Sequence, residues 1–247
     1  MSKKNKVSSK QRTQLDNINK IFFRSDYMLS EASVTYNEYS SKMRVCYSGI
    51  PESFFRANQV RTDWKEFGVF RILYVGRLIT YKRIDAIIDA VAIAFPKKKF
   101  LLEIIGDGVL KAELQQRCIT MNVENQVKFY GRLPRQQVID RMLKADCFVM
   151  ISEKETFGLV YLEAMASGAI TVASFDGGVD GIIISGENGF LSSQGDSEQL
   201  AEMLIHINNL SLQEVMTIRQ KAIATVDRYT DRNVAERYLN DILEIGD

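Results

Sequence analysis

From residue 70 onward, the chain alternates between two spacings of apolar residues. Short runs that are apolar on consecutive residues are typical of buried strands, whereas apolar residues at every third or fourth position are typical of helices. The predicted strands cover residues 69–76, 99–108, 126–131, 147–152 and 169–174. The predicted helices cover the stretch with Ile84, Ile87, Ile88, Val91 and Phe95 on one face, then 109–121, 134–144 and most of 152–168.

Strands that are apolar throughout, separated by helices, indicate a parallel sheet whose two faces are both covered. We therefore predict an α/β fold with a doubly wound parallel sheet. In that architecture ligands bind at the carboxyl ends of the strands, where the loops lead into the helices. The segments "VGR", "IGDG", "YGR" and "SEKETFG" all lie at the carboxyl ends of predicted strands, so we expect the chemistry of the protein at this edge.

The two ends of the chain have different patterns. The C-terminal stretch predicts helices over 196–209, 212–227 and 231–244. The N-terminal stretch predicts a helix near 11–23, a strand at 26–30, a helix near 31–40 and an extended segment at 43–51. One or two strands are too few for a separate core, so the N-terminal stretch is either an appendage or the remnant of a larger domain.

The charge balance argues against a polyanionic partner. The chain has 32 Lys and Arg against 31 Asp and Glu, so there is no general electrostatic attraction to nucleic acid or to an anionic membrane. We expect no nucleic-acid partner. Any anion site must be local.

Cysteine use and hydropathy point to the cytoplasm. Cys46, Cys118 and Cys147 lie far apart in the chain, which suits a reduced compartment and a role as small buried apolar groups. The longest apolar runs are shorter than the roughly 18 residues that a membrane-spanning helix needs. The basic stretch 1–12 is expected to be a solvated tail, with a peripheral contact to anionic lipid as the alternative.

The segment "GRLITYKR" (76–83) is a candidate phosphate site. Arg77 comes just after a predicted strand, and Lys82 comes at the start of the next helix. Two cations beside a helix N-terminus, whose free N–H groups also favour negative charge, form a cradle for phosphate. The alternative is a solvated pair of charges at the end of a strand.

Two further turns lie on the same edge. In "GDG", Gly106 and Gly108 around Asp107 let the backbone approach a ligand closely, but the segment lacks the third glycine of a dinucleotide fingerprint. By itself it is equally a turn and a helix start. The turn "YGRLP" (130–134) is a further strand-end turn, with Pro134 placed to begin a helix.

The segment "SEKETFGLVYLEAMASG" (152–168) carries the strongest signal. Glu155 lies before the predicted helix, and Glu163 lies inside it, tilted back towards the N-terminus. The backbone N–H groups of Phe157, Gly158 and Leu159 are first-turn donors. We expect both carboxylates to face one cleft and accept hydrogen bonds from hydroxyls, while the helix start binds a phosphate.

A structural alternative exists for both carboxylates. Glu155 would be an acidic residue that complements the helix dipole, and Glu163 would be a surface glutamate on the helix. The alternative is weak for Glu163, because its neighbours are apolar or small and a buried carboxylate needs a polar partner.

The segments "VGRLITYKRID", "IIGDG", "FYGRL", "SEKETFGLVYLEAMASG" and "GENGFL" occur in this order. Together they resemble the nucleotide-sugar-binding C-terminal domain of family-4 retaining glycosyltransferases (group 1, GT-B fold). The resemblance covers roughly residues 70–210. More faintly, "SDYMLSEAS" and "MRVCYSGIP" are similar to the end of the N-terminal domain and the linker of that family. It implies that residues 1–50 are the end of an acceptor domain with its linker, and that 51–247 are the donor-binding domain with C-terminal helices.

The resemblance also implies residue roles. Arg77 and Lys82 would hold the donor diphosphate and stabilise the leaving group, and Glu155 would position the donor sugar through its hydroxyls. Glu163 would bind the ribose, and Arg132 and Leu133 would lie near the base. The remaining donor-binding residues would be Gly76, Gly106, Asp107, Gly108, Thr156, Phe157, Gly158 and Leu159.

In this family the donor is a UDP-, GDP- or ADP-sugar, the acceptor is a glycan or a lipid-linked glycan, and no metal is needed. The resemblance therefore implies a retaining transferase without a cofactor. Because the acceptor domain is nearly absent, we expect the chain to be either a fragment of a longer enzyme or a subunit that meets an acceptor-domain partner chain or self-associates, and to be incomplete as an enzyme by itself.

Two departures from the family keep other hypotheses open. Gly181 stands where the family usually has a glutamate, with Asp180 one position earlier, and the catalytic His or Asp of the acceptor domain has no counterpart. The only histidine, His206, falls in a predicted amphipathic helix. The alternatives are a non-catalytic subunit that binds nucleotide sugar or a protein partner, and, more weakly, a GT-B-like epimerase or phosphorylase.

Overall fold

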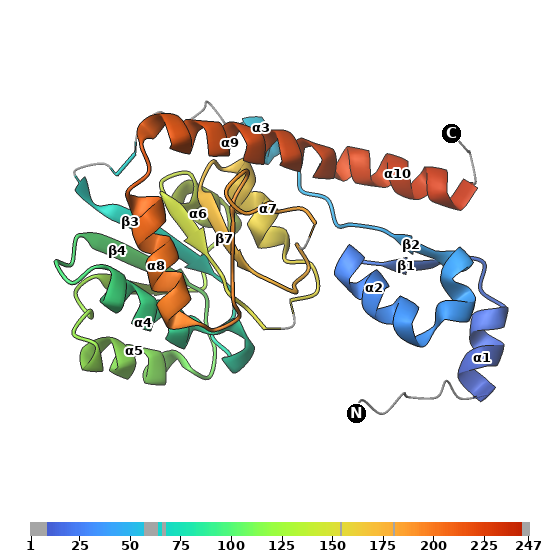
Figure 1. Ribbon diagram of the computed structural model, residues 1–247, viewed down its shortest axis with the longest axis horizontal. Helices are drawn as coiled ribbons and strands as arrows, with labels where there is room; N and C mark the ends of the chain where they lie inside the picture. The colour runs from blue at the N-terminus through green and yellow to red at the C-terminus, as the bar shows by residue number, and fades with distance from the viewer. Residues whose placement is uncertain (1–8, 57–63, 66–67, 154, 180, 244–247) are drawn as a thin grey trace.

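The computed structural model describes residues 9–56, 64–65, 68–153, 155–179 and 181–243 (Figure 1). A large α/β body lies at one end of the molecule, and a small N-terminal unit lies at the other. The two C-terminal helices run along the top of the view, from the body to the N-terminal unit.

The α/β body is built on one parallel sheet of six strands. Their order is β5-β4-β3-β6-β7-β8. The strands are β3 (Phe70–Val75), β4 (Phe100–Ile105), β5 (Val127–Gly131), β6 (Cys147–Val149), β7 (Ile170–Ser174) and β8 (Phe190–Ser192). The chain winds outward from β3 to β5, returns to β6, and winds outward again to β8. The predicted doubly wound parallel sheet is confirmed.

Helices cover both faces of this sheet. On one face α4 packs against α5 and α8, and on the other α7 packs against α9 (Figure 1). The helices of the body are α3 (Ser53–Arg56), α4 (Ile84–Ala94), α5 (Lys111–Thr120), α6 (Arg135–Met142), α7 (Leu159–Ala166), α8 (Ser197–Asn208) and α9 (Leu212–Val226). The helices predicted for the body are thus all present, with shorter ends.

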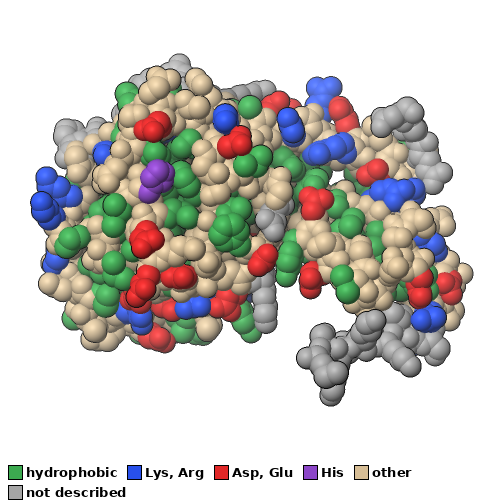
Figure 2. Space-filling view, in the orientation of Figure 1, with side chains coloured by type: hydrophobic (Ala, Val, Ile, Leu, Met, Phe, Trp, Pro, Cys, Tyr) green, Lys and Arg blue, Asp and Glu red, His purple; other side chains and the backbone are tan. Residues whose placement is uncertain are grey.

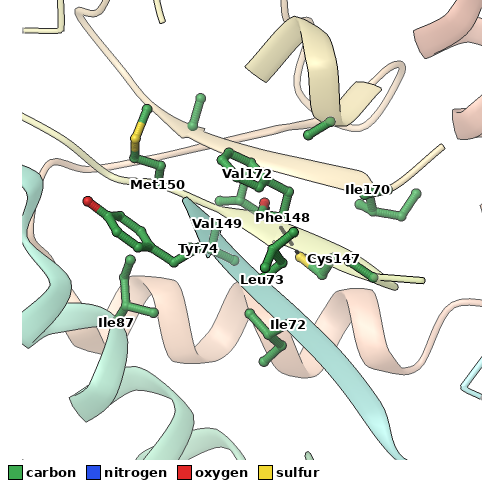
Figure 3. Close-up of a cluster of buried hydrophobic side chains, with 14 of the residues drawn as sticks. Ile72, Leu73, Tyr74, Ile87, Cys147, Phe148, Val149, Met150, Ile170 and Val172 are labelled. Carbon is green, nitrogen blue, oxygen red and sulfur yellow. Dashed lines mark hydrogen bonds between the residues drawn. The ribbon is translucent and has the colours of Figure 1, made fainter. Parts of the chain in front are cut away.

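The central strands are apolar on consecutive residues because helices cover both of their faces. Figure 3 shows Leu73 and Tyr74 of β3 beside Phe148 and Val149 of β6, with Ile87 of α4 reaching the same cluster. All five side chains have no exposed surface. Full burial of one such side chain contributes about 1.5–3 kcal/mol, so this cluster holds the sheet and α4 together.

The N-terminal unit differs from the prediction at two places. The expected helix near 11–23 ends at Asp16 as α1 (Ser9–Asp16), and residues Ile21–Phe23 form β1. This strand pairs in parallel with β2 (Met43–Val45), with Ile21 opposite Met43. The paired residues are 22 positions apart in the chain. The periodicity of a short segment carries no information about such a distant partner.

The expected strand at 26–30 is also wrong, because this segment begins a helix, α2 (Asp26–Thr35). Ser25 caps the helix by accepting a hydrogen bond from the Met28 amide, and Asp26 lies in the first turn. An N-cap and an acidic first turn favour a helix start, and here they outweigh the strand preference of the side chains. A short 3₁₀ helix, η1 (Asn37–Lys42), then leads to β2.

Two smaller features were also not predicted. The edge strand β8 was missed because only two consecutive residues there, Phe190 and Leu191, are apolar, too few to establish a period. Cys118 and Cys147 are buried as expected, but Cys46, just after β2, is only half-buried.

The last helix, α10 (Asp231–Leu243), joins the body to the N-terminal unit. It follows the 3₁₀ turn η4 (Asp227–Tyr229). Hydrogen bonds in both directions hold Ile50 to this region, through the Tyr229 carbonyl and the Asp231 amide. Further along, the ring of Tyr238 packs edge-on against Phe22 of β1, with centroids 4.8 Å apart. The C-terminal helix therefore fixes the N-terminal unit beside the body.

The surface is mixed in charge. Figure 2 shows acidic and basic side chains interspersed over one face of the molecule. Within the described residues, no helix is both long enough and apolar enough to cross a bilayer.

Candidate functional site

The site lies where the winding of the sheet reverses, at the carboxyl ends of β3 and β6. These two strands are neighbours, and the loop after each one carries a predicted site residue. The loop after β3 contains η3 (Thr80–Lys82). Its Lys82 forms an ion pair with Glu155, which lies on the loop after β6. The structure thus brings together two residues that are 73 positions apart in the chain.

The ion pair is largely withdrawn from solvent. The side chains of Lys82 and Glu155 are 17% and 14% exposed, and the sulfur of Met150 lies 3.9 Å from the Lys82 ammonium. A charge in such a place needs a partner. In the absence of a ligand, each of the two groups supplies the partner of the other.

Two buried tyrosines make hydrogen bonds to the backbone near this ion pair. Tyr74 donates a hydrogen bond from its hydroxyl to the Arg77 carbonyl at 3.0 Å, and Tyr161 donates to the Met150 carbonyl at 2.8 Å. Burial, and then the negative charge of Glu155, raise the pKa of both phenols. Both tyrosines therefore stay neutral and hold the loop backbones in place.

Arg77 is exposed at the tip of the loop after β3. Among the described residues, its guanidinium has no hydrogen-bond or ion-pair partner. The cation is therefore available to an anion that approaches the ends of the strands.

The glycines of the loops after β3 and β4 are explained by close packing between the two loops. Gly106 has φ +139°, and a Cβ there would lie 1.8 Å from the Gly76 carbonyl oxygen. A Cβ on Gly108 would lie 2.3 Å from the Leu78 carbonyl oxygen, and the Leu78 amide donates to the Asp107 carbonyl. These contacts account for the glycines as a turn, so a donor-binding role for them stays a prediction.

The start of α7 is also shaped by a glycine. Gly158 is the N-cap residue, with φ +77°, and a Cβ there would lie 2.4 Å from the Tyr161 ring. Phe157 is buried, whereas Thr156 and Leu159 are exposed. Thr156 also receives a hydrogen bond at its carbonyl from the Ser25 hydroxyl, 2.8 Å away in the N-terminal unit.

Glu163 has a partner that the sequence analysis missed. Its side chain is 18% exposed and pairs with Arg135 of α6 at 3.1 Å. Burial raises the pKa of Glu163, and the positive charge of Arg135 opposes that rise. The only sequence signal was a basic residue just after Pro134, which does not reveal a contact with a helix 28 residues away.

The remaining predicted residues lie farther along the sheet. Arg132 is exposed and Leu133 is half-buried, and both follow β5, two strands away from β3 in the sheet order. Gly181 has φ +81°, and Asp180 lies outside the described residues. His206 is in α8, with its ring against Phe190 at 5.8 Å. Among the described residues, no group of three or more His, Cys, Asp or Glu side chains is placed to hold a metal ion.

Sequence similarity shows to which family the chain belongs. The family model described as "Glycosyl transferases group 1" matches residues 62–223. The chain belongs to this family. The loops after β3 and β6, with Lys82 and Glu155, all lie within the matched stretch.

The chain resembles longer proteins. It is 27% identical over 169 residues to the N-acetyl-alpha-D-glucosaminyl L-malate synthase of Bacillus anthracis, which covers 67% of this chain and 44% of that protein. The structure of Anabaena Alr3699/HepE in complex with UDP and glucose matches with a TM-score of 0.76 at 22% identity. That match covers 98% of this chain and 70% of the Anabaena chain. The chain thus spans less than half the length of the Bacillus relative.

A third match involves one domain only. The C-terminal domain of a glycosyl transferase group 1 family protein (LpcC) from Francisella tularensis matches with a TM-score of 0.64 at 26% identity. The match covers 74% of this chain and 99% of that domain.

Proposed function

We propose that this chain is the donor-binding part of a retaining glycosyltransferase. It binds a nucleotide-diphosphate sugar at the carboxyl ends of β3 and β6, and the sugar passes to a glycan or lipid-linked acceptor with its anomeric configuration retained. The observation that carries the proposal is the Lys82–Glu155 pair at the point where the sheet winding reverses. Open α/β sheets bind their ligands at this point, and the family transfers sugars.

The two cations act on the diphosphate. Arg77, which is exposed, meets the incoming phosphates, and Lys82 exchanges part of its contact with Glu155 for a phosphate oxygen. As the bond to the sugar breaks, negative charge develops on the leaving diphosphate. A fixed cation in a site of low dielectric stabilises such charge more than water does. No metal is required for this step in the proposal.

Glu155 then accepts hydrogen bonds from hydroxyls of the donor sugar and positions the sugar; it does not attack the anomeric carbon. Glu163, with Arg135 behind it, accepts hydrogen bonds from the ribose hydroxyls. The other donor contacts come from Gly76, Gly106, Asp107, Gly108, Thr156, Phe157, Gly158 and Leu159, with Arg132 and Leu133 near the base.

An acceptor domain, from a partner chain or from more of the same polypeptide, completes the active site. Three observations support this part of the proposal. The chain spans 44% of its Bacillus relative. Where the structure describes it, its N-terminal unit has only a two-stranded parallel sheet, although parallel sheets are usually larger and covered on both faces. A groove of about 890 Å³ also runs along this unit, lined in part by Leu15, Ile18, Ile21, Phe23, Tyr36 and Met43.

We accordingly propose residues 1–50 as the end of the acceptor domain with its linker, and 51–247 as the donor domain. The Francisella C-terminal domain supports this division, because it matches as a separate unit. We also propose that the protein acts in the cytoplasm, with peripheral membrane contact if the acceptor is lipid-linked. Self-association through the exposed Leu239, Ile242 and Leu243 of α10 is the alternative to a partner chain.

One observation favours a second candidate, a non-catalytic subunit that binds nucleotide sugar. Gly181 has φ +81° and is exposed, a backbone conformation that a glutamate adopts only with strain. A glutamate at this position would strain the loop in this conformation. The loop therefore lacks the side chain that the family usually has beside the donor site.

A calorimetric titration with UDP, GDP and ADP tests the proposal. We expect saturable binding of one of them, unchanged when EDTA is present, and sugar transfer only after an acceptor-domain protein is added. Binding without transfer under every acceptor condition would favour the non-catalytic subunit. No binding of any nucleotide would contradict both candidates.

A further inference from the structure

Arg83 follows Lys82 in the chain, and the proposed function gives it no role. We propose that Arg83 is a positioning residue that holds the loop carrying Lys82 against the loop carrying Glu155. The proposal rests on the proposed function only for what the two loops bind. The contacts between the loops are properties of the chain without a ligand.

The guanidinium of Arg83 joins three loops at the carboxyl edge of the sheet. Its Nη1 donates to Glu153 at 2.8 Å, on the loop after β6. Its Nη2 lies 3.3 Å from Asp85 in the first turn of α4, and 3.5 Å from the Gly195 carbonyl on the loop after β8. Two carboxylates and one carbonyl thus occupy its donors, so Arg83 does not supply a further cation for the diphosphate.

The contact with Glu153 is one of three consecutive connections between the two loops. The Glu153 amide donates to the Tyr81 carbonyl at 2.7 Å. Lys82 pairs with Glu155, and Arg83 pairs with Glu153. Lys82 therefore lies between two residues that are both attached to the loop of its partner. Apart from these neighbours, the contacts that hold its ammonium at the end of β6 are those with Glu155 and with the Met150 sulfur, 3.9 Å away.

The backbone supports a dedicated role for this side chain. Arg83 has φ +47° and ψ +42°, a left-handed conformation that costs energy for any residue with a Cβ. Glycine would take it without strain. An arginine in this place needs a compensating interaction, and the ion pairs with Glu153 and Asp85 provide one.

The third loop leaves room for the guanidinium. Gly195 has φ +67°, and a Cβ there would lie 2.0 Å from Nη1 of Arg83. The absence of a side chain at Gly195 is therefore a condition for the docked position of Arg83. Three loops contribute to the same arrangement, and none of the groups that contact the Arg83 guanidinium is assigned to the donor.

The test compares Arg83→Gln with Arg117→Gln. Arg117 also forms an arginine–carboxylate pair, with Asp89 of α4 at 2.7 Å, but it lies on α5. Amide hydrogen exchange is measured on the full chain without ligand. In Arg83→Gln we expect the Glu153 amide and residues 155–159 to exchange about two- to fivefold faster, the factor for loss of a partly exposed ion pair. In Arg117→Gln we expect these amides to be unchanged.

A second variant and a second readout guard against general unfolding. Glu153→Gln should give the same local pattern. In UDP titrations Arg83→Gln should weaken binding about three- to tenfold, in the lower part of the range for groups coupled in one network, and Arg83→Lys should restore part of the loss. In a Lys82→Ala background the same change should have an effect of less than about twofold.

The inference would be overturned if the amides of residues 153 and 155–159 exchanged at the wild-type rate in both Arg83→Gln and Glu153→Gln, whether or not nucleotide binds. An equal loss of affinity with and without Lys82 would also overturn it, since Arg83 would then act independently. If the wild-type chain binds no nucleotide, the proposed function fails, and the exchange comparison still decides the role of Arg83.

Discussion

The ion pair between Lys82 and Glu155 offers the sharpest test of the site. Its two members bind each other in the free protein, and in the proposed function they bind the donor. Lys82→Ala removes the cation and leaves Glu155 with a side chain that is 14% exposed and has lost its partner. The variant should therefore change both the free energy of unfolding and the affinity for nucleotide.

The two effects have separate magnitudes. Leaving a buried polar group without its partner costs about 1–3 kcal/mol; because the pair keeps some contact with water, we expect about 1–2 kcal/mol. For a chain of this size, that corresponds to a fall in Tm of about 2–8 °C. A hydrogen bond to a charged group contributes about 1.5–3 kcal/mol, so nucleoside-diphosphate binding should weaken about 10- to 150-fold.

The assay is thermal unfolding together with calorimetric titration of UDP, on the wild type, Lys82→Ala, Glu155→Gln and the double variant. The double variant should regain part of the lost stability, because neither charge is then left alone. Lys221→Ala is the control: Lys221 also pairs with a glutamate, Glu187 at 3.3 Å, but both side chains are half exposed. Its removal should change the free energy of unfolding by less than about 1 kcal/mol.

Two results would refute the reasoning. If the losses of stability in the single variants add fully in the double variant, the two groups are not coupled. If Lys82→Ala binds UDP as tightly as the wild type does, the ammonium is not part of the phosphate cradle.

Two further predictions concern neighbouring features of the edge. Because burial raises the pKa of Glu163 above its ordinary 4.5, the protonated carboxyl favours the folded state; this contribution is full below pH 4.5 and is lost as pH rises through the raised pKa. Urea unfolding at a series of pH values should show this loss in the wild type and not in Glu163→Gln, and identical pH profiles would contradict it. Gly106→Ala should cost about 3 kcal/mol or more, because strain and a backbone clash add, whereas Gly131→Ala, with φ +67° and open space around it, should cost about 1–2 kcal/mol. Equal losses of unfolding free energy in the two variants would contradict the close packing of the loops.

The α/β body was predictable because its elements carry their own signals. The strands around Leu73 and Phe148 are apolar on consecutive residues, and this pattern arises only where both faces are covered. The helices between them have apolar residues at helical spacing. Where the signal was short, or depended on a distant partner, prediction failed: the apolar run of β8 is only Phe190 and Leu191, and β1 exists because it pairs with β2.

The site divides in the same way. By itself the sequence determined that Lys82, Glu155 and the glycine turns fall at the carboxyl ends of parallel strands, because in a doubly wound sheet all such ends meet at one edge. Only the tertiary structure decided which side chains touch. Arg135 reaches Glu163, and Arg83 reaches Glu153, across 28 and 70 residues of chain. These pairings depend on how adjacent loops and helices pack in space. Neither the spacing of apolar residues nor the type of a single residue shows which side chains come within contact distance.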